Sequence, residues 1–338
     1  MKKVNIKALA KELNLSPATV SKALRDSHEI SAATKQRVLE VAKQLNYAPN
    51  AYASSLRDRR SRNIAVIIPE VADSFFSIAI NGIEAAIEEK DYHVLIYLTH
   101  ELYAREQAIL KDFKSGRVDG VLISVSRETT DGSHISELIA EDVPVVFFDR
   151  VLENVEAPKV VTDDFNSGYT GAMHLLDNGC RHIAFLGISN SLSISNNRMA
   201  GYQQALKDHH LTVSPDDMIT CTPDTAANFT AIKQLLAKEN RPDGIVASVE
   251  NLTNTVYQVC NELQLSIPQD IKVVCFSNLD IAAILHPPLT TITQPAFQIG
   301  KAAAELLLKS LGKKDAPSPA TQIVIPSELI IRGSSKRS

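Results

Sequence analysis

Polar and aromatic side chains follow several short β-rich runs of this sequence and are well suited to bind a small molecule. Carboxylates such as Asp149 and Asp163 could accept hydrogen bonds from hydroxyl groups, and Arg198 could donate two parallel bonds to a hydroxyl pair or an anion. The predicted ligand-binding residues are Asp73, Phe75, Phe76, Ser124, Asp149, Arg150, Asp163, Arg198, Glu250 and Ser277. Taken singly, each carboxylate could instead cap a helix or form half of an ion pair.

A second group of residues suited to recognition begins at Ser16. Ser16 can cap a helix that has Pro17 at its first position, and the short joint Asn14-Leu15 fits the corner of a helix-turn-helix unit. The start of the second helix of such a unit enters the major groove of DNA. The residues predicted to lie nearest the groove are Ser16, Pro17, Ala18, Thr19, Ser21 and Lys22. Of these, Pro17, Ala18 and Lys22 are the candidates for reading bases, whereas Ser16 could only cap the helix and Lys22 could be solvated.

Residues 47–62 form a polar, basic connector with a possible short helix capped by Asn50. Ala53 and Leu56 are three residues apart and therefore share one face of that helix. Leu56 is a large apolar side chain among small and basic ones, which suits a wedge inserted into the minor groove of DNA. Leu56 could alternatively pack on the domain that follows.

The charge of the chain is distributed unevenly. Residues 1–62 contain 13 Lys and Arg against 5 Asp and Glu, which leaves 22 basic and 34 acidic residues of the 35 and 39 in the whole chain. The net charge of −4 therefore conceals a segment of +8 joined to a body of −12. Only the N-terminal segment is suited to phosphates.

Several functional classes lack support in the sequence. It contains no G-x-G-x-x-G, Walker, G-x-S-x-G or H-E-x-x-H motif, and neither its histidines nor its cysteines have the spacing of metal ligands, so we expect no enzyme, cofactor or metal site. The four cysteines lie in apolar runs, which predicts that they are reduced and buried in the core. No secretory signal or membrane-length apolar run occurs, which predicts a cytoplasmic protein without a membrane partner.

The elements that must position these residues change at about residue 63. The first 46 residues contain three helical patterns over 6–13, 17–24 and 32–45, whereas the rest alternates β-rich runs with helical segments in two similar series. We therefore expect an all-α helix-turn-helix headpiece joined to an α/β core of two doubly wound parallel-sheet subdomains. The predicted domains are 1–46 for the headpiece, 47–62 for the hinge helix and linker, 63–160 with 293–322 for the first subdomain, and 161–292 with 323–338 for the second.

The whole chain resembles the lactose/galactose repressor family of bacterial transcription regulators. The resemblance rests on the segment Leu15–Leu24, on Leu45-Asn46-Tyr47-Ala48-Pro49-Asn50, on Arg198-x-x-Gly201-Tyr202, and on Pro287-Pro288-Leu289-Thr290-Thr291-Ile292. It implies a periplasmic-binding-protein-like core with a small effector between its subdomains. It further implies a homodimer on a pseudo-palindromic operator, with two hinge helices in the minor groove and Leu56 at the central step.

Four positions depart from the family's common pattern. Asp73-Ser74-Phe75-Phe76 replaces the usual Asn-Pro-Phe-Phe, Lys22 replaces an Arg, Val249-Glu250 replaces an Asn-Asp pair, and Cys275–Asn278 replaces Gly-Phe-Asp-Asp. Three of these departures fall in the predicted effector cleft. They leave the fold unaffected and bear on the identity of the effector.

These observations predict a DNA-binding repressor of carbohydrate-utilisation genes whose operator affinity is controlled by a sugar or sugar derivative. Two alternatives come from other classes of protein. A solute receptor with the same two-lobed core would not need the basic N-terminal segment. A sugar-processing enzyme could use Asp149 or Asp163 as a general base, although no nucleophile or cofactor motif accompanies them.

Overall fold

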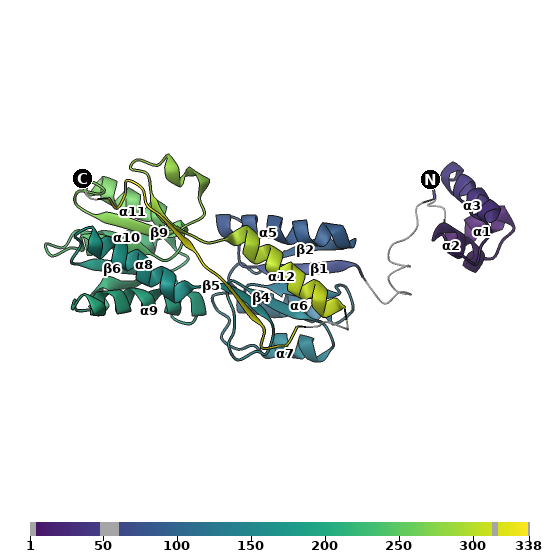
Figure 1. Cartoon of the computed structure of the whole chain (residues 1–338), viewed down its shortest axis with the longest axis horizontal. Helices are drawn as coiled ribbons and strands as arrows, with labels where there is room; N and C mark the ends of the chain where they lie inside the picture. Colours follow the sequence, from purple (N-terminus) through teal and green to yellow (C-terminus); the bar gives the residue numbers. More distant parts are fainter. Residues whose placement is uncertain (1–4, 48–60, 313–316, 337–338) are drawn as a thin grey trace. The chain divides into compact units, whose positions relative to one another are not determined.

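The computed structural model describes residues 5–47, 61–312 and 317–336, and the chain forms two compact units, Met1–Ser61 and Arg62–Ser338. The first unit contains helices α1 (Ile6–Leu13), α2 (Pro17–Leu24) and α3 (Ala32–Gln44) (Figure 1). Asn5, Ser16 and Ser31 cap these helices by accepting a hydrogen bond from a backbone N–H three residues later. Leu9, Val20 and Val38 are fully buried between the helices, so one small core holds the predicted helix-turn-helix unit together.

The second unit contains two sheets, each with helices on both faces. The first sheet has the order β11-β5-β4-β3-β1-β2, and every strand pair in it is parallel. Its strands are β1 (Asn63–Ile68), β2 (His93–Leu98), β3 (Gly120–Ile123), β4 (Val145–Phe148), β5 (Lys159–Thr162) and β11 (Gln322–Ile325). One face is covered by α5 (Ser74–Ile87) and α12 (Ala296–Leu311), and the other by α6 (Tyr103–Phe113) and α7 (Ser133–Ala140) (Figure 1).

The second sheet repeats this arrangement with the order β12-β10-β9-β8-β6-β7. Its strands are β6 (Ile183–Gly187), β7 (Met218–Thr220), β8 (Gly244–Ala247), β9 (Lys272–Phe276), β10 (Thr290–Thr293) and β12 (Glu328–Ile330), of which β12 is antiparallel to β10. Helices α8 (Asp164–Asp177) and α9 (Ser193–Asp208) cover one face, and α10 (Thr225–Leu236) and α11 (Asn251–Glu262) cover the other. Short 3-10 turns occupy Glu88–Lys90, Pro215–Asp217 and Asp280–Ala283.

The chain passes between the two sheets after β5, after β10 and after β11, so the predicted return of the C-terminal segment occurs (Figure 1). The boundaries expected at 160 and 322 fall inside β5 and β11, both of which pair within the first sheet. The boundary expected at 293 falls on the last residue of β10, which pairs within the second sheet. The first subdomain therefore extends to residue 162 and includes 322–325. Sequence alternation could not place these boundaries because β5 and β11 are short strands directly followed by residues of the other subdomain.

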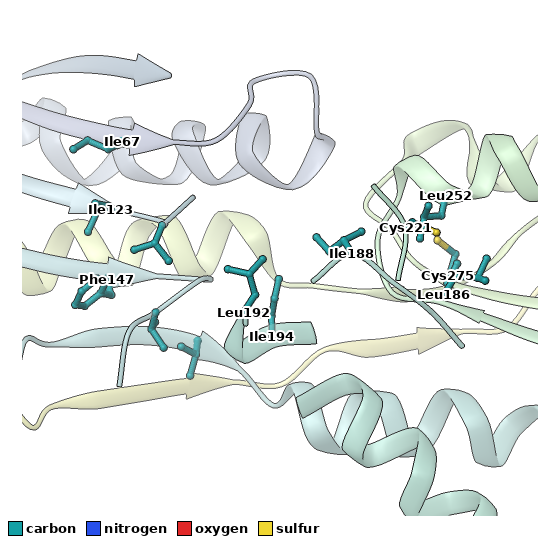
Figure 2. Close-up of a cluster of buried hydrophobic side chains, with 14 of the residues drawn as sticks. Ile67, Ile123, Phe147, Leu186, Ile188, Leu192, Ile194, Cys221, Leu252 and Cys275 are labelled. Atoms are coloured by element: carbon teal, nitrogen blue, oxygen red, sulfur yellow. The ribbon is translucent and has the colours of Figure 1, made fainter. Parts of the chain in front are cut away.

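A buried apolar cluster continues from one subdomain into the other (Figure 2). Ile188 and Leu192, in the segment that joins β6 to α9, and Ile194, in the first turn of α9, lie between side chains of the first sheet such as Phe147 and side chains of the second such as Leu186. They are at most 6% exposed. Removing such apolar surface from water stabilises the approach of the two subdomains.

Two glycines allow α8 and α9 to cross closely. A Cβ atom at Gly168 would lie 2.1 Å from the carbonyl oxygen of Arg198, and one at Gly201 would lie 2.0 Å from that of Phe165. Any larger residue would separate the helices, so this crossing fixes the main chain of Arg198. All four cysteines are buried and free, in agreement with the sequence, and no helix within the described ranges is long and apolar enough to span a bilayer.

Candidate functional site

The predicted DNA-contacting residues of the first unit lie at the start of α2. Ser16, Pro17 and Ala18 are exposed, whereas Thr19, Ser21 and Lys22 are half-buried. The hydroxyl of Ser16 accepts a hydrogen bond from the N–H of Thr19 at 3.0 Å, which makes Ser16 the helix cap. The most exposed residues at the start of α2 are therefore Pro17 and Ala18, with Lys22 partly exposed one turn later.

Lys22 forms an ion pair with Glu29 on the surface of this unit. The pair is half-exposed, so it contributes little to stability and the Lys22 ammonium can exchange its partner for a phosphate or a base. Asn50, Ala53 and Leu56, predicted for the minor groove, lie outside the described residues.

The second unit contains two adjoining cavities in the cleft between its subdomains, where the carboxyl ends of both parallel sheets meet. The first, called the inner cavity, has a volume of about 20 Å³, and the second, called the outer cavity, has one of about 400 Å³. All but two of the predicted ligand-binding residues line the inner cavity, namely Asp73, Phe75, Phe76, Asp149, Arg150, Arg198, Glu250 and Ser277. Residues from both subdomains thus converge on one site.

Ser124 and Asp163 lie outside both cavities. The Ser124 side chain is fully buried behind Arg150, whose backbone N–H is 3.4 Å from its hydroxyl oxygen. Asp163 lies where the chain passes from β5 to α8, and its Oδ1 accepts hydrogen bonds from the Ser327 N–H and the Ser167 hydroxyl. Asp163 therefore joins two of the passages between subdomains, and its role as a ligand contact is not supported.

Arg198 is held rigidly in the inner cavity. Its Nε donates to Asp164 at 2.7 Å, its Nη1 donates to the carbonyl oxygen of Ser248 at 2.6 Å, and its guanidinium carbon lies 4.2 Å from the centre of the Phe276 ring. These contacts fix the plane of the guanidinium group. Such a fixed group can donate directed bonds to a hydroxyl pair or an anion.

Two aspartates of the first subdomain lie near this arginine, Asp149 buried and Asp73 half-buried. Burial raises the pKa of Asp149 to about 6, against the opposing effect of the Arg150 and Arg198 charges, while Asp164 and Asp73 add to the increase. Burial, followed by the nearby Glu250, also raises the pKa of Asp73, which caps α5 by accepting from the Phe75 N–H. Both carboxyls therefore ionise less readily than solvated ones.

Glu250 connects the two subdomains across the inner cavity. Its Oε1 accepts hydrogen bonds from the N–H and the hydroxyl of Ser74 at 3.1 and 2.7 Å, at the start of α5 in the first subdomain. Its Oε2 accepts from the Ser277 hydroxyl and the Asn278 N–H at 3.2 and 3.1 Å. Ser74 and Glu250 are two of the departures from the family pattern, and they bind each other.

The outer cavity contains polar residues that the sequence analysis did not select. Arg127 and Glu101 come from the first subdomain, and Asn228, Asn254 and Gln258 from the second. The signal for Arg127 was present, because it follows β3 as closely as other chosen residues follow their strands. Phe276, Asn278 and Gln294 were likewise omitted from the predicted site and line the inner cavity.

Comparison with known proteins agrees with this architecture. Residues 5–50 match the profile of "Bacterial regulatory proteins, lacI family", and residues 172–335 match a "Periplasmic binding protein-like domain". The chain is 28% identical over 332 residues to the HTH-type transcriptional regulator RegA of Clostridium saccharobutylicum, with 98% of each chain covered. It is 29% identical over 331 residues to the HTH-type transcriptional repressor CytR of Escherichia coli, covering 98% of this chain and 96% of CytR.

Solved structures show the same fold. The chain is similar to the lac repressor dimer bound to operator and an anti-inducer, with a TM-score of 0.85, 21% identity, and coverage of 99% of this chain and 100% of the other. It is also similar to a putative ribose operon repressor from Burkholderia thailandensis, with a TM-score of 0.73, 25% identity, and coverage of 80% and 99%.

Proposed function

We propose that this chain, which matches the lacI family profile and resembles named transcription regulators along its length, is a DNA-binding transcriptional repressor whose operator affinity is controlled by a small effector bound in its cleft. The effector is a sugar or sugar derivative, and the regulated genes serve carbohydrate utilisation. The observation that carries this proposal is the convergence of Asp149, Arg198 and aromatic side chains from two subdomains on the inner cavity. A relative that is named a ribose operon repressor supports the sugar class.

Control of DNA binding follows from the position of the cavity between the subdomains. A ligand that contacts both subdomains binds the closed arrangement better than the open one and therefore shifts the population between them. The repressor acts as a homodimer on a pseudo-palindromic operator in the cytoplasm. Support for the homodimer comes from large apolar side chains left exposed in the single chain, such as Ile284 at 79% and Ile281 at 51%.

The DNA contacts divide between two grooves. Pro17 and Ala18 in the first turn of α2, together with Lys22 in its second turn, read bases in the major groove. Thr19 and Ser21 contact phosphates, and Ser16 caps the helix beside them. Asn50, Ala53 and Leu56 act at the minor groove. The chain is a regulator and not an enzyme, as its named relatives are transcription regulators.

Selection of binding sites from random duplex DNA by the full-length protein tests the DNA part of the proposal. We expect a pseudo-palindromic sequence, bound with a steep dependence on salt because phosphate contacts release counterions. Retention of no sequence above the random background contradicts the proposal. Titration of the selected duplex in the presence of individual sugars tests the effector part, and sedimentation of the protein–DNA complex tests the dimer.

A further inference from the structure

Three arginines of the cleft carry a buried N–H group that has no acceptor. Among the described residues, these groups are Nε of Arg127, Nε of Arg150 and Nη2 of Arg198. All three side chains line one or both cavities. Buried donors in native proteins are nearly always paired, so these positions indicate where a bound molecule would supply acceptor atoms.

Arg127 differs from the other two because, among the described residues, no carboxylate forms an ion pair with its guanidinium group. Arg150 donates two bonds of 2.9 Å to Glu101, and Arg198 is paired with Asp164. Within the described part of the chain, no carboxylate lies within 4 Å of the Arg127 guanidinium nitrogens. Burial lowers the pKa of Arg127, since desolvation disfavours the charged form, while the nearby Glu101 opposes this effect; an anion bound beside Arg127 would favour the charged form further.

The main chain at Arg127 is fixed before any ligand binds. The Arg127 N–H donates to Glu101 at 2.7 Å. The preceding residue, Ser126, donates from its N–H and its hydroxyl to the fully buried Glu106 at 2.7 and 2.8 Å. Because the main chain is already ordered at Arg127, a ligand that binds there does not have to order this segment.

Helix α11 adds a second attraction for negative charge. Asn251, Leu252, Asn254 and Thr255, in its first two turns, line the outer cavity together with Arg127. The Glu250 side chain does not cap this helix, because its oxygens accept the bonds from Ser74, Ser277 and Asn278. The N-terminal end of a helix carries a partial positive charge that favours anions.

The acidic residues of the cleft oppose an anion less than their number suggests. Glu101 is paired with Arg150, and Glu250 accepts four hydrogen bonds from the protein. Glu70, which also lines the outer cavity, lies 3.0 Å from Nδ1 of His100. Asp73 and Asp149 have raised pKa values and take up a proton more readily than solvated aspartates. The outer cavity thus presents the guanidinium group of Arg127 without an ion-paired carboxylate among the described residues.

We propose that the effector is an anionic sugar derivative whose carboxylate or phosphate group is bound by Arg127 in the outer cavity, while its hydroxyl groups contact Asp149 and Arg198 in the inner cavity. This inference rests on the proposed function, because it specifies the chemistry of the effector of the same cleft. The bidentate geometry of guanidinium suits both carboxylate and phosphate.

The test is calorimetric titration of the full-length protein with matched neutral and anionic probes. The probes are glucose, galactose and fructose, their 6-phosphates, and gluconate, glucuronate and galacturonate, so that the phosphate and carboxylate arms are separated. We expect the tightest ligand to be an anion. Replacing Arg127 with Gln should weaken that ligand about 10- to 100-fold, the size of a lost charge-assisted contact, whereas the neutral parent sugar should change little.

Two further variants complete the design. Arg105→Gln removes an exposed arginine of α6 in the same subdomain and should leave every affinity unchanged. Arg127→Lys keeps the charge without the two parallel donors and should restore part of the affinity. Circular dichroism of each variant verifies that the fold is retained.

A neutral sugar that binds as tightly as its anionic counterparts would overturn this inference, as would an anion preference that survives Arg127→Gln or a panel in which no anion binds. A different outcome would refute the proposed function. That function requires at least one compound of the panel, neutral or anionic, to change the affinity of the protein for the selected operator duplex. A neutral sugar that does so sustains the proposed function and refutes the anionic effector.

Discussion

The contact between Glu250 and Ser74 provides the sharpest prediction, because it joins residues 176 positions apart on opposite sides of the cleft. Glu250→Ala removes the acceptor of two hydrogen bonds from the first subdomain and of two from its own. Only the first two bonds break when the cleft opens. The substitution should therefore destabilise the closed arrangement more than either subdomain.

The magnitude follows from the kind of bond. A hydrogen bond to a charged group contributes about 1.5–3 kcal/mol, and Glu250 is only 7% exposed, so solvent does not replace the lost contacts in the closed form. Because both partners become hydrated on opening, we expect the two bonds together to contribute about 3 kcal/mol. This corresponds to a change of roughly a hundredfold in the ratio of closed to open molecules.

A double-mutant cycle with Ser74→Ala isolates the contact from other effects of each substitution. Urea unfolding of the wild type, both single variants and the double variant should give a coupling free energy of about 1.5–3 kcal/mol for the hydroxyl bond at 2.7 Å. Small-angle X-ray scattering of Glu250→Ala should show a larger radius of gyration. Glu262→Ala, which removes a half-exposed partner of Lys233, is the matched control and should change neither quantity.

The reasoning is refuted if the coupling free energy is below about 0.5 kcal/mol, the size of additivity errors between independent sites. A Glu250→Ala protein as compact as the wild type would also refute it. Either result would mean that the apolar cluster around Leu192 closes the cleft without this contact.

Three other predictions concern DNA, pH and the helix crossing. Lys22→Ala should weaken binding to the selected operator more than binding to random DNA. Leu56→Ala should reduce both the affinity for the operator and the bending of the DNA. Gel mobility of circularly permuted fragments measures affinity and bending, and unchanged bending in Leu56→Ala rules out the wedge. The affinity for an anionic ligand should fall as the pH rises from 6 to 8, because Asp149, with a pKa of about 6, ionises near the bound ligand. Calorimetry with a sugar acid that stays ionised over this range measures the pH dependence. Asp149→Asn should make the affinity nearly independent of pH. Gly168→Ala should cost about 2 kcal/mol or more of unfolding free energy and displace Arg198, since the added Cβ meets a carbonyl oxygen at 2.1 Å, while the exposed Thr170→Ala on the same helix should unfold like the wild type.

The sequence by itself determined the elements and most of the site. Ser16 and Pro17 are local signals for the start of a helix, and the Ser16 cap forms as predicted because a cap needs only residues within one turn. The change to alternating β-rich runs after residue 63 similarly predicted two parallel sheets. In such sheets the carboxyl ends of the strands share one edge, so residues after the strands converge without knowledge of their contacts.

Only the tertiary structure decided what each of those residues does. Asp149 and Asp163 look alike in sequence, but one lines the inner cavity and the other binds Ser327 where the chain passes between subdomains. Position after a strand gives the edge of the sheet, whereas the role depends on which distant segment packs against that edge. Segments far apart in the chain likewise bring Ser74 to Glu250 and leave Arg127 Nε without an acceptor. Local sequence patterns contain no information about such long-range contacts.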